Sequence, residues 1–236
     1  MSQILFIPGL LCTSAIFQSQ FAAFEGVADC HVASTIEMES IEEMADAALA
    51  QMDGTFSVLG FSMGGYVALE VARRAPDRVE GLALVSTSAR PDTPEKKQAR
   101  AELVNLSKIG KFKGVTPRLL PRFFSEASLQ DETKTSIVLK MGADIGQENF
   151  MRQQQAIMSR RDQRPYLPSF DKPSVVICGT KDILTPPEDS QEMASLLPQA
   201  DLLLLDEIAH MSTLEAPDDV NNALRQWHAR TQDKSV

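Results

Sequence analysis

Short apolar runs and amphipathic stretches alternate along most of this chain. The apolar runs have the length of strands and are bounded by turn residues or polar loops; they cover residues 4–7, 29–34, 56–59, 82–85, 174–178 and 202–205, the second being the weakest. Stretches with apolar side chains at helical spacing lie between them, at residues 41–53, 63–75, 187–197 and 217–230. Alternating strands and helices predict a parallel sheet that helices cover on both faces. We therefore expect an α/β fold with a mostly parallel sheet of about six strands.

The middle of the chain lacks this alternation. Residues 91–167 contain no strand pattern but several helix-like runs, such as 95–108 and 149–160. Their net charge is +5, whereas the rest of the chain carries −14. We expect residues 91–167 to form a helical cap, inserted into an α/β core made of residues 1–90 and 168–236.

The composition excludes several kinds of partner. A net charge of −9 over 236 residues argues against binding to duplex nucleic acid, which needs a basic protein face. No apolar run approaches the length that spans a bilayer, and residues 1–12 lack the basic start and the cleavage site of a signal peptide. Three scattered cysteines indicate reduced thiols rather than disulfides or a zinc site. We expect a cytoplasmic protein without nucleic-acid or membrane partners, and the sequence leaves its oligomeric state open.

A candidate nucleophile lies between a predicted strand and a predicted helix. Residues 60–64 read G-F-S-M-G, with Ser62 at the centre and glycine two positions away on either side. A tight strand-to-helix turn forces the central residue into a strained backbone and leaves no room for side chains at the glycine positions. The five letters alone also fit a glycine-rich phosphate loop or a plain turn. Their position after the strand at 56–59 favours a nucleophile.

A serine nucleophile needs a base, and the chain has only three histidines. His31 falls within a predicted strand and His228 on the last predicted helix, where packing or surface roles are expected. His210 follows the strand at 202–205, at the carboxyl end of the sheet, where open α/β sheets place their sites. We therefore expect His210 to be the base.

Two further parts complete such a site. Asp182, in the loop after the strand at 174–178, is the expected carboxylate behind the histidine, with Asp206 and Asp92 as rivals. An oxyanion hole needs two converging backbone N–H groups. We expect these from Met63, directly after the nucleophile, and from Leu10, in the loop after the first strand.

With these motifs in place, the chain resembles the serine hydrolases of the α/β-hydrolase fold, esterase-like and with a helical cap. Three segments carry the resemblance over nearly the whole chain: the elbow at 60–64, the acid segment at 172–186 and the histidine segment at 210–217. The order Ser62, Asp182, His210 is also that of the family. The chain departs from it in having Pro8 where the family has histidine, and in lacking early antiparallel strands.

The resemblance implies acyl transfer to water without a metal or an organic cofactor. The implied substrate is a small carboxylic ester, lactone or thioester, which would form an acyl-enzyme on Ser62. Apolar residues flank the predicted site and suggest a pocket for an apolar acyl group, although they could equally belong to the core; they are Leu11, Phe61, Leu184 and Met211.

Other functions fit the same residues. Within enzymes, the alternatives are a cofactor-free haloperoxidase or perhydrolase, or a C–C hydrolase or lyase with the same triad. Outside enzymes, a small-molecule receptor could keep the triad and turn over slowly. Rapid multiple turnover of a short p-nitrophenyl ester would favour the enzyme, and a single slow acylation would favour the receptor.

Overall fold

The computed structural model describes residues 1–110 and 112–233. Residue 111, in the predicted cap, and residues 234–236, at the end of the predicted core, lie outside the described residues. Six strands form one sheet in the order β2-β1-β3-β4-β5-β6, and every neighbouring pair is parallel; they are β1 (Ser2–Ile7), β2 (Ala28–Val32), β3 (Phe56–Phe61), β4 (Val79–Val85), β5 (Ser174–Gly179) and β6 (Ala200–Leu205). The predicted fold class is confirmed.

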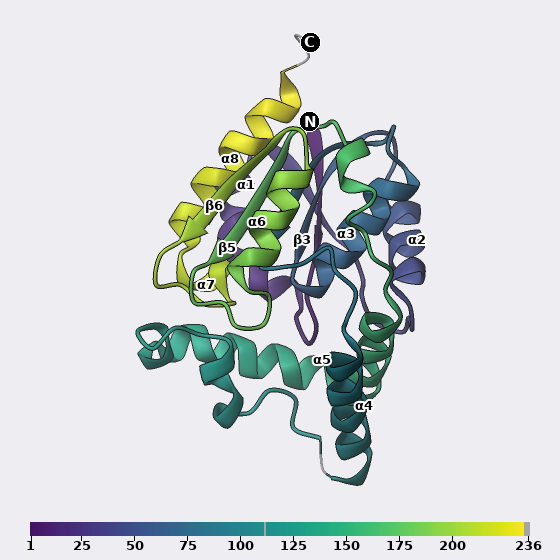
Figure 1. Ribbon diagram of the computed structural model, residues 1–236. Coiled ribbons are helices and arrows are strands. Elements are labelled where there is room, and N and C mark those ends of the chain that lie inside the picture. The colour runs from purple at the N-terminus through teal and green to yellow at the C-terminus, as the bar shows by residue number, and fades with distance from the viewer. Residues whose placement is uncertain (111, 234–236) are drawn as a thin grey trace.

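Helices cover both faces of the sheet (Figure 1). One face packs against α2 (Ile41–Gln51), α3 (Met63–Arg74) and α6 (Pro187–Leu196), and the other against α1 (Gln18–Phe24) and α8 (Pro217–Gln232). The sheet therefore separates two apolar cores. All six residues of β3 are buried, which explains why apolar side chains occupy both faces of this strand and Ser57 is its one polar residue.

Local sequence signals set several helix boundaries. The Ser40 side chain accepts the Glu43 N–H at 3.1 Å, and the Glu43 carboxylate accepts the Glu39 N–H, so that α2 begins with a capping arrangement. Pro217 occupies the first turn of α8, where its missing N–H leaves no helical bond unmade. The sequence did not delimit α1, because the helix is short and has no side-chain cap.

The described residues of 91–167 form a helical segment beyond the carboxyl ends of the strands (Figure 1). Its elements are α4 (Pro94–Ile109), α5 (Glu132–Ser159) and two 3₁₀ turns, η2 (Pro117–Arg122) and η3 (Ser128–Gln130). Gly146 has φ 77° and ψ 173° and divides α5 into two helices that meet at a kink. The predicted run at 149–160 corresponds to the second of these. Two short elements complete the chain, η4 (Leu167–Ser169) and α7 (Ser212–Glu215).

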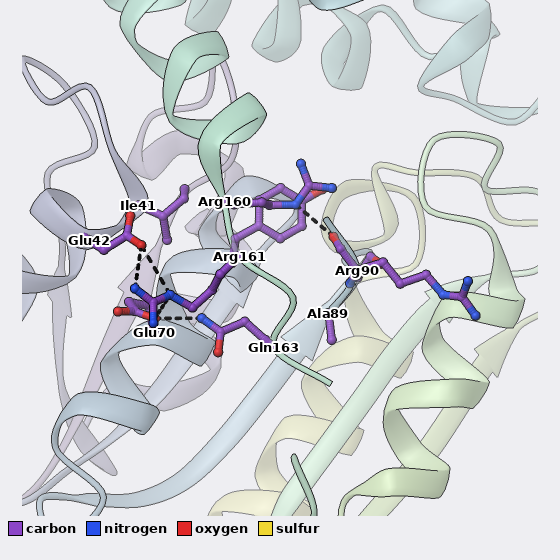
Figure 2. A pocket seen from close by; sticks show the side chains of 10 residues that line it. Ile41, Glu42, Glu70, Ala89, Arg90, Arg160, Arg161 and Gln163 are labelled. Carbon is purple, nitrogen blue, oxygen red and sulfur yellow. Dashed lines mark hydrogen bonds and ion pairs between the residues drawn. The ribbon is translucent and has the colours of Figure 1, made fainter. Parts of the chain in front are cut away.

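Two chain crossings, residues 88–92 and 160–163, connect the helical segment to the sheet; we call them the neck. The Arg160 guanidinium lies 3.0 Å from the buried Asp92 carboxylate. Its Nε donates to the Arg90 carbonyl at 3.0 Å (Figure 2). The two crossings are therefore tied to each other by an ion pair and a charge-assisted hydrogen bond.

A buried carboxylate lies beside the neck. Glu70 of α3 is fully buried, and it accepts hydrogen bonds from Arg73 and Arg74. It also accepts one from Gln163 (Figure 2). The cavity enclosed here is about 10 Å³, which holds one water molecule at most. The residues in Figure 2 thus form a polar joint between α3 and the neck, without space for a substrate.

No helix in residues 1–110 or 112–233 combines the length and the apolar character that crossing a membrane requires.

Candidate active site

Ser62 occupies the turn between β3 and α3. Its backbone has φ 53° and ψ −116°, outside the helical region that follows it. Two hydrogen bonds hold it there: its N–H donates to the Val85 carbonyl at 2.9 Å, and the Thr87 hydroxyl donates to its carbonyl at 2.7 Å. The side chain is half-buried and stands at the amino end of α3.

Glycines make this turn possible because backbone passes through the space that their side chains would fill. A Cβ on Gly64 would lie 1.9 Å from the Ile7 carbonyl oxygen, and one on Gly60 would lie 2.3 Å from the carbonyl oxygen of Gly64. Both distances are far below van der Waals contact. The G-x-S-x-G pattern is therefore required by the close approach of β1, β3 and α3.

His210 lies between Ser62 and Asp182. Its Nε2 is 3.0 Å from the Ser62 Oγ, and its Nδ1 is 2.8 Å from Asp182 Oδ2. With the proton on Nδ1 donated to the carboxylate, Nε2 is free to accept the serine proton. The ring also packs against Phe61, with centroids 5.4 Å apart. Three residues that are distant in the sequence thus form one hydrogen-bonded chain.

The carboxylate of Asp182 is buried and fully engaged. One oxygen accepts the N–H groups of Leu184 and Thr185, and the other accepts the Thr185 hydroxyl at 2.8 Å in addition to His210. Burial acts to raise the pKa of Asp182, but the neighbouring His210 and these hydrogen bonds outweigh it and hold the pKa below its usual value. Asp182 therefore stays ionised at neutral pH.

The two rival carboxylates have other partners. Asp206 is exposed and accepts hydrogen bonds from the Thr180 hydroxyl and the Glu207 N–H. Asp92 is bound by Arg100 and Arg160 at the neck. Among the histidines, His228 is buried on α8 with its Nε2 3.1 Å from the Ser2 hydroxyl, and His31 is a half-buried residue of β2.

Neither of the two N–H groups predicted to form the oxyanion hole has an acceptor within the part of the chain that the structure describes. One belongs to Met63, the first residue of α3, and the other to Leu10. The following N–H groups are all occupied: Leu11 donates to Gln153 and Cys12 to the Gly9 carbonyl. The Leu10 N–H thus differs from the N–H groups of Leu11 and Cys12 in having no acceptor among the described residues.

The four residues predicted to line a pocket differ in accessibility. Leu184 is half-buried, whereas Leu11 and Met211 are buried. Phe61 has no exposed surface, and its ring contacts the His210 imidazole. Phe61 therefore supports the imidazole from inside the protein.

Sequence reasoning did not identify four polar residues around the site. Thr87 binds the Ser62 carbonyl, and Thr185 binds the Asp182 carboxylate. Gln153 and Glu215 connect the loops of the site to the helical segment. A threonine three residues after an acidic residue is a usable local signal. Gln153 leaves no such signal, because its partner Leu11 is 142 residues away. Among the described residues, no group of three or more His, Cys, Asp and Glu side chains could hold a metal ion.

Comparison with known proteins identifies the family. The family model described as serine aminopeptidase, S33, matches residues 37–217. A pimeloyl-[acyl-carrier protein] methyl ester esterase from Neisseria meningitidis serogroup C is 31% identical over 178 residues, which cover 72% of this chain and 68% of that protein. The chain belongs to this family of α/β-hydrolases.

Other matches agree with that assignment. A 3-oxoadipate enol-lactonase 2 from Acinetobacter baylyi is 29% identical over 171 residues, covering 70% of this chain and 60% of that protein. The solved structure of a thermophilic esterase from Thermogutta terrifontis superposes with a TM-score of 0.88 at 25% identity, covering 98% of this chain and 90% of the other. The chain is thus an α/β-hydrolase enzyme, as its motifs predict.

Proposed function

We propose that this enzyme hydrolyses a small carboxylic ester, lactone or thioester through an acyl-enzyme on Ser62. The observation that carries the proposal is the continuous hydrogen-bonded chain from Ser62 Oγ through His210 to Asp182, with distances of 3.0 Å and 2.8 Å. Such a chain lets a neutral hydroxyl act as a nucleophile at neutral pH.

The reaction follows from these positions. His210 Nε2 takes the Ser62 proton as Oγ attacks the substrate carbonyl carbon, and the N–H groups of Leu10 and Met63 stabilise the resulting oxyanion. The imidazolium then protonates the leaving alcohol, and the C–O bond breaks to leave the acyl-enzyme. Water, deprotonated by His210, attacks the acyl carbonyl, and return of the proton to Oγ releases the carboxylic acid.

Asp182 has an electrostatic role in this scheme. Its depressed pKa keeps it ionised, so that it favours the imidazolium that forms in both transition states. Its hydrogen bond to Nδ1 also selects the tautomer in which Nε2 is the base. Thr185 supports the carboxylate by donating its hydroxyl and its N–H.

The substrate class rests on the relatives and on the residues around Ser62. Two relatives are named for a methyl ester and an enol-lactone. The surrounding residues Leu10, Leu11, Leu184 and Met211 favour an apolar acyl group. We further propose that residues 91–167 act as a cap over a core of residues 1–90 and 168–236, because they lie beyond the carboxyl ends of the strands.

Compartment and partners follow from charge and cysteine chemistry. All three cysteines are free thiols, which supports a reducing compartment such as the cytoplasm. The net charge of −9 supports a small-molecule substrate rather than a nucleic acid.

Active-site labelling tests the proposal. A fluorophosphonate should label the wild type and Ser195→Ala, which changes an exposed serine, but not Ser62→Ala. Rapid multiple turnover of p-nitrophenyl butyrate should disappear with the labelling. Labelling of Ser62→Ala would show that another serine is the nucleophile. A single slow acylation of the wild type would favour a receptor, and peroxide-dependent halogenation without ester turnover would favour a haloperoxidase.

A further inference from the structure

One buried side chain connects the helical segment to the loop that carries the Leu10 N–H. Gln153 of α5 has no exposed surface. Its Oε1 accepts the Leu11 N–H at 3.0 Å, and its Nε2 donates to both the carbonyl and the hydroxyl of Thr35, at 3.1 Å and 3.3 Å. A single amide therefore holds the loop after β1 and the loop after β2 against α5.

The loop that Gln153 holds has an unusual backbone. Leu11 has φ 57°, a conformation that residues with a side chain rarely adopt. The Cys12 N–H closes the turn on the Gly9 carbonyl at 3.1 Å, and the Thr13 N–H points to the sulfur of Met141, also on α5. Strain of this kind persists only where surrounding contacts hold it. Here α5 supplies two of those contacts.

We propose that Gln153 is a positioning residue that holds the turn at residues 9–12 so that the Leu10 N–H points at the developing oxyanion. This inference rests on the proposed acyl-transfer function. The Leu11 N–H belongs to the peptide group that joins residues 10 and 11. Fixing this N–H therefore fixes the orientation of the peptide group that directly follows the Leu10 N–H in the chain. An oxyanion donor contributes most when it is held in place before the reaction.

The proposal makes the helical segment part of the catalytic apparatus. Rotation of the peptide between residues 10 and 11 should leave the hydrogen bonds of Ser62, His210 and Asp182 intact, since among the described residues none of these three is hydrogen-bonded to Gln153. The effect on catalysis should therefore be specific to the transition state. Ground-state binding should change little, because the substrate carbonyl gains most from the donor only once it carries negative charge.

A neighbouring glutamine provides a matched control. Gln154 is also buried on α5, but its Oε1 accepts a hydrogen bond from Arg100 within the helical segment. Gln153→Met and Gln154→Met thus remove the same amide from the same helix, and both cost stability because each leaves a donor unpaired. Only the first of them releases the Leu11 N–H.

Steady-state kinetics with p-nitrophenyl butyrate and inhibition by a trifluoromethyl ketone, which forms a tetrahedral oxyanion on serine, separate the two roles. For Gln153→Met we expect kcat to fall about 10- to 100-fold and ketone affinity to fall in proportion, with KM within about threefold of the wild type. Gln154→Met should keep the wild-type kcat and ketone affinity. Thermal unfolding of both variants measures the structural cost separately.

Equal kcat values for the two variants, or a change in KM alone, would overturn the proposal. Should Gln153→Met not fold, Gln153→Asn decides in its place, because it keeps a polar amide that is one methylene too short to span Leu11 and Thr35. Wild-type kcat in Gln153→Asn would then overturn the positioning role. A wild type that neither hydrolyses the ester nor reacts with fluorophosphonate would overturn the acyl-transfer function itself, and this inference with it.

Discussion

Ser62 keeps a strained backbone because its neighbours leave the chain no relaxed alternative. A positive φ at a residue with a side chain costs about 1–3 kcal/mol. Its N–H and carbonyl are both bound, by Val85 and Thr87, and the flanking glycines allow β1 and α3 to approach the turn. The strain lifts the hydroxyl out of the sheet toward His210. The unfavourable backbone conformation of Ser62 therefore places its hydroxyl where His210 can deprotonate it.

The orienting carboxylate can be tested by comparing two aspartates. Asp182→Asn should lower kcat for p-nitrophenyl butyrate by roughly 10³ to 10⁴, because an amide favours the wrong tautomer of His210 and carries no charge to stabilise the imidazolium. Asp206→Asn should change kcat by less than about threefold, since its carboxylate is exposed and binds Thr180 and Glu207. Both variants should keep the wild-type circular dichroism spectrum.

If Asp206→Asn lost activity and Asp182→Asn kept it, Asp206 would be the carboxylate that orients His210. Loss of activity in both variants, together with a lower unfolding temperature, would indicate damage to the loops rather than to the triad.

At the level of elements, the parallel sheet brings the triad together. Ser62 follows β3, Asp182 follows β5 and His210 follows β6, so all three leave the same edge of the sheet. Because the strands are parallel, residues that are 120 and 148 positions apart from Ser62 meet at the carboxyl edge of the same sheet.

The elements that could be predicted from the sequence are those with strong local causes. Strands buried on both faces appear as continuous apolar runs, and the elbow requires its glycines. The sequence predicts helices within 91–167 but does not delimit the first half of α5, because Gly146 interrupts the helical repeat. Gln153 and Glu215 could not be found, since their roles depend on partners that only the folded chain brings near.

A substitution at Glu215 tests whether the loop that carries His210 needs its hydrogen-bonded connection to the helical segment. One of its carboxylate oxygens accepts the Ala209 N–H at 3.1 Å, next to His210, and the other accepts the Ser125 N–H at 2.8 Å. In Glu215→Gln one of these N–H groups would face an amide NH₂, which costs about 1–3 kcal/mol. We expect a lower free energy of unfolding in urea and slower fluorophosphonate labelling, because His210 is held less firmly.

Glu207 offers the control for this experiment. It lies in the same loop, but its carboxylate is exposed and pairs with Lys181 at 3.1 Å. Glu207→Gln should change the free energy of unfolding by less than about 1 kcal/mol. Equal losses in the two variants would show that the loop does not depend on the bridge to Ser125.

At the level of the whole molecule, the helical segment depends on the neck. Arg160 and Asp92 tie its two crossings together, and Gln163 connects the second crossing to Glu70 of α3. Arg161, also at the neck, binds Glu42 at the start of α2 (Figure 2). Ion pairs of this kind fix the orientation of the helical segment relative to the sheet, but they are lost when their carboxylates become protonated. The stability of the joint should therefore depend on the ionisation of its most buried carboxylate, Glu70.

The pH dependence of unfolding should reveal this dependence. Burial raises the pKa of Glu70, but hydrogen bonds from Arg73, Arg74 and Gln163 outweigh it and lower the pKa from 4.5 to about 2. A carboxyl whose pKa is lower when folded stabilises the protein fully above its unfolded pKa, and this stabilisation is lost as the pH falls from about 4.5 toward 2. The shift corresponds to at most about 3 kcal/mol, reduced by solvent around the two arginines.

Glu70→Gln should therefore unfold at lower urea concentration than the wild type at pH 6, and the difference should shrink steadily from pH 4.5 to pH 2.5. The reason is that the wild type loses the charge of Glu70 over this range, whereas the variant has none to lose. Glu148→Gln, which changes an exposed carboxylate on α5, should follow the wild type at every pH. A gap between Glu70→Gln and the wild type that stays constant down to pH 2.5 would mean that Glu70 contributes by packing and hydrogen bonding alone, without its charge.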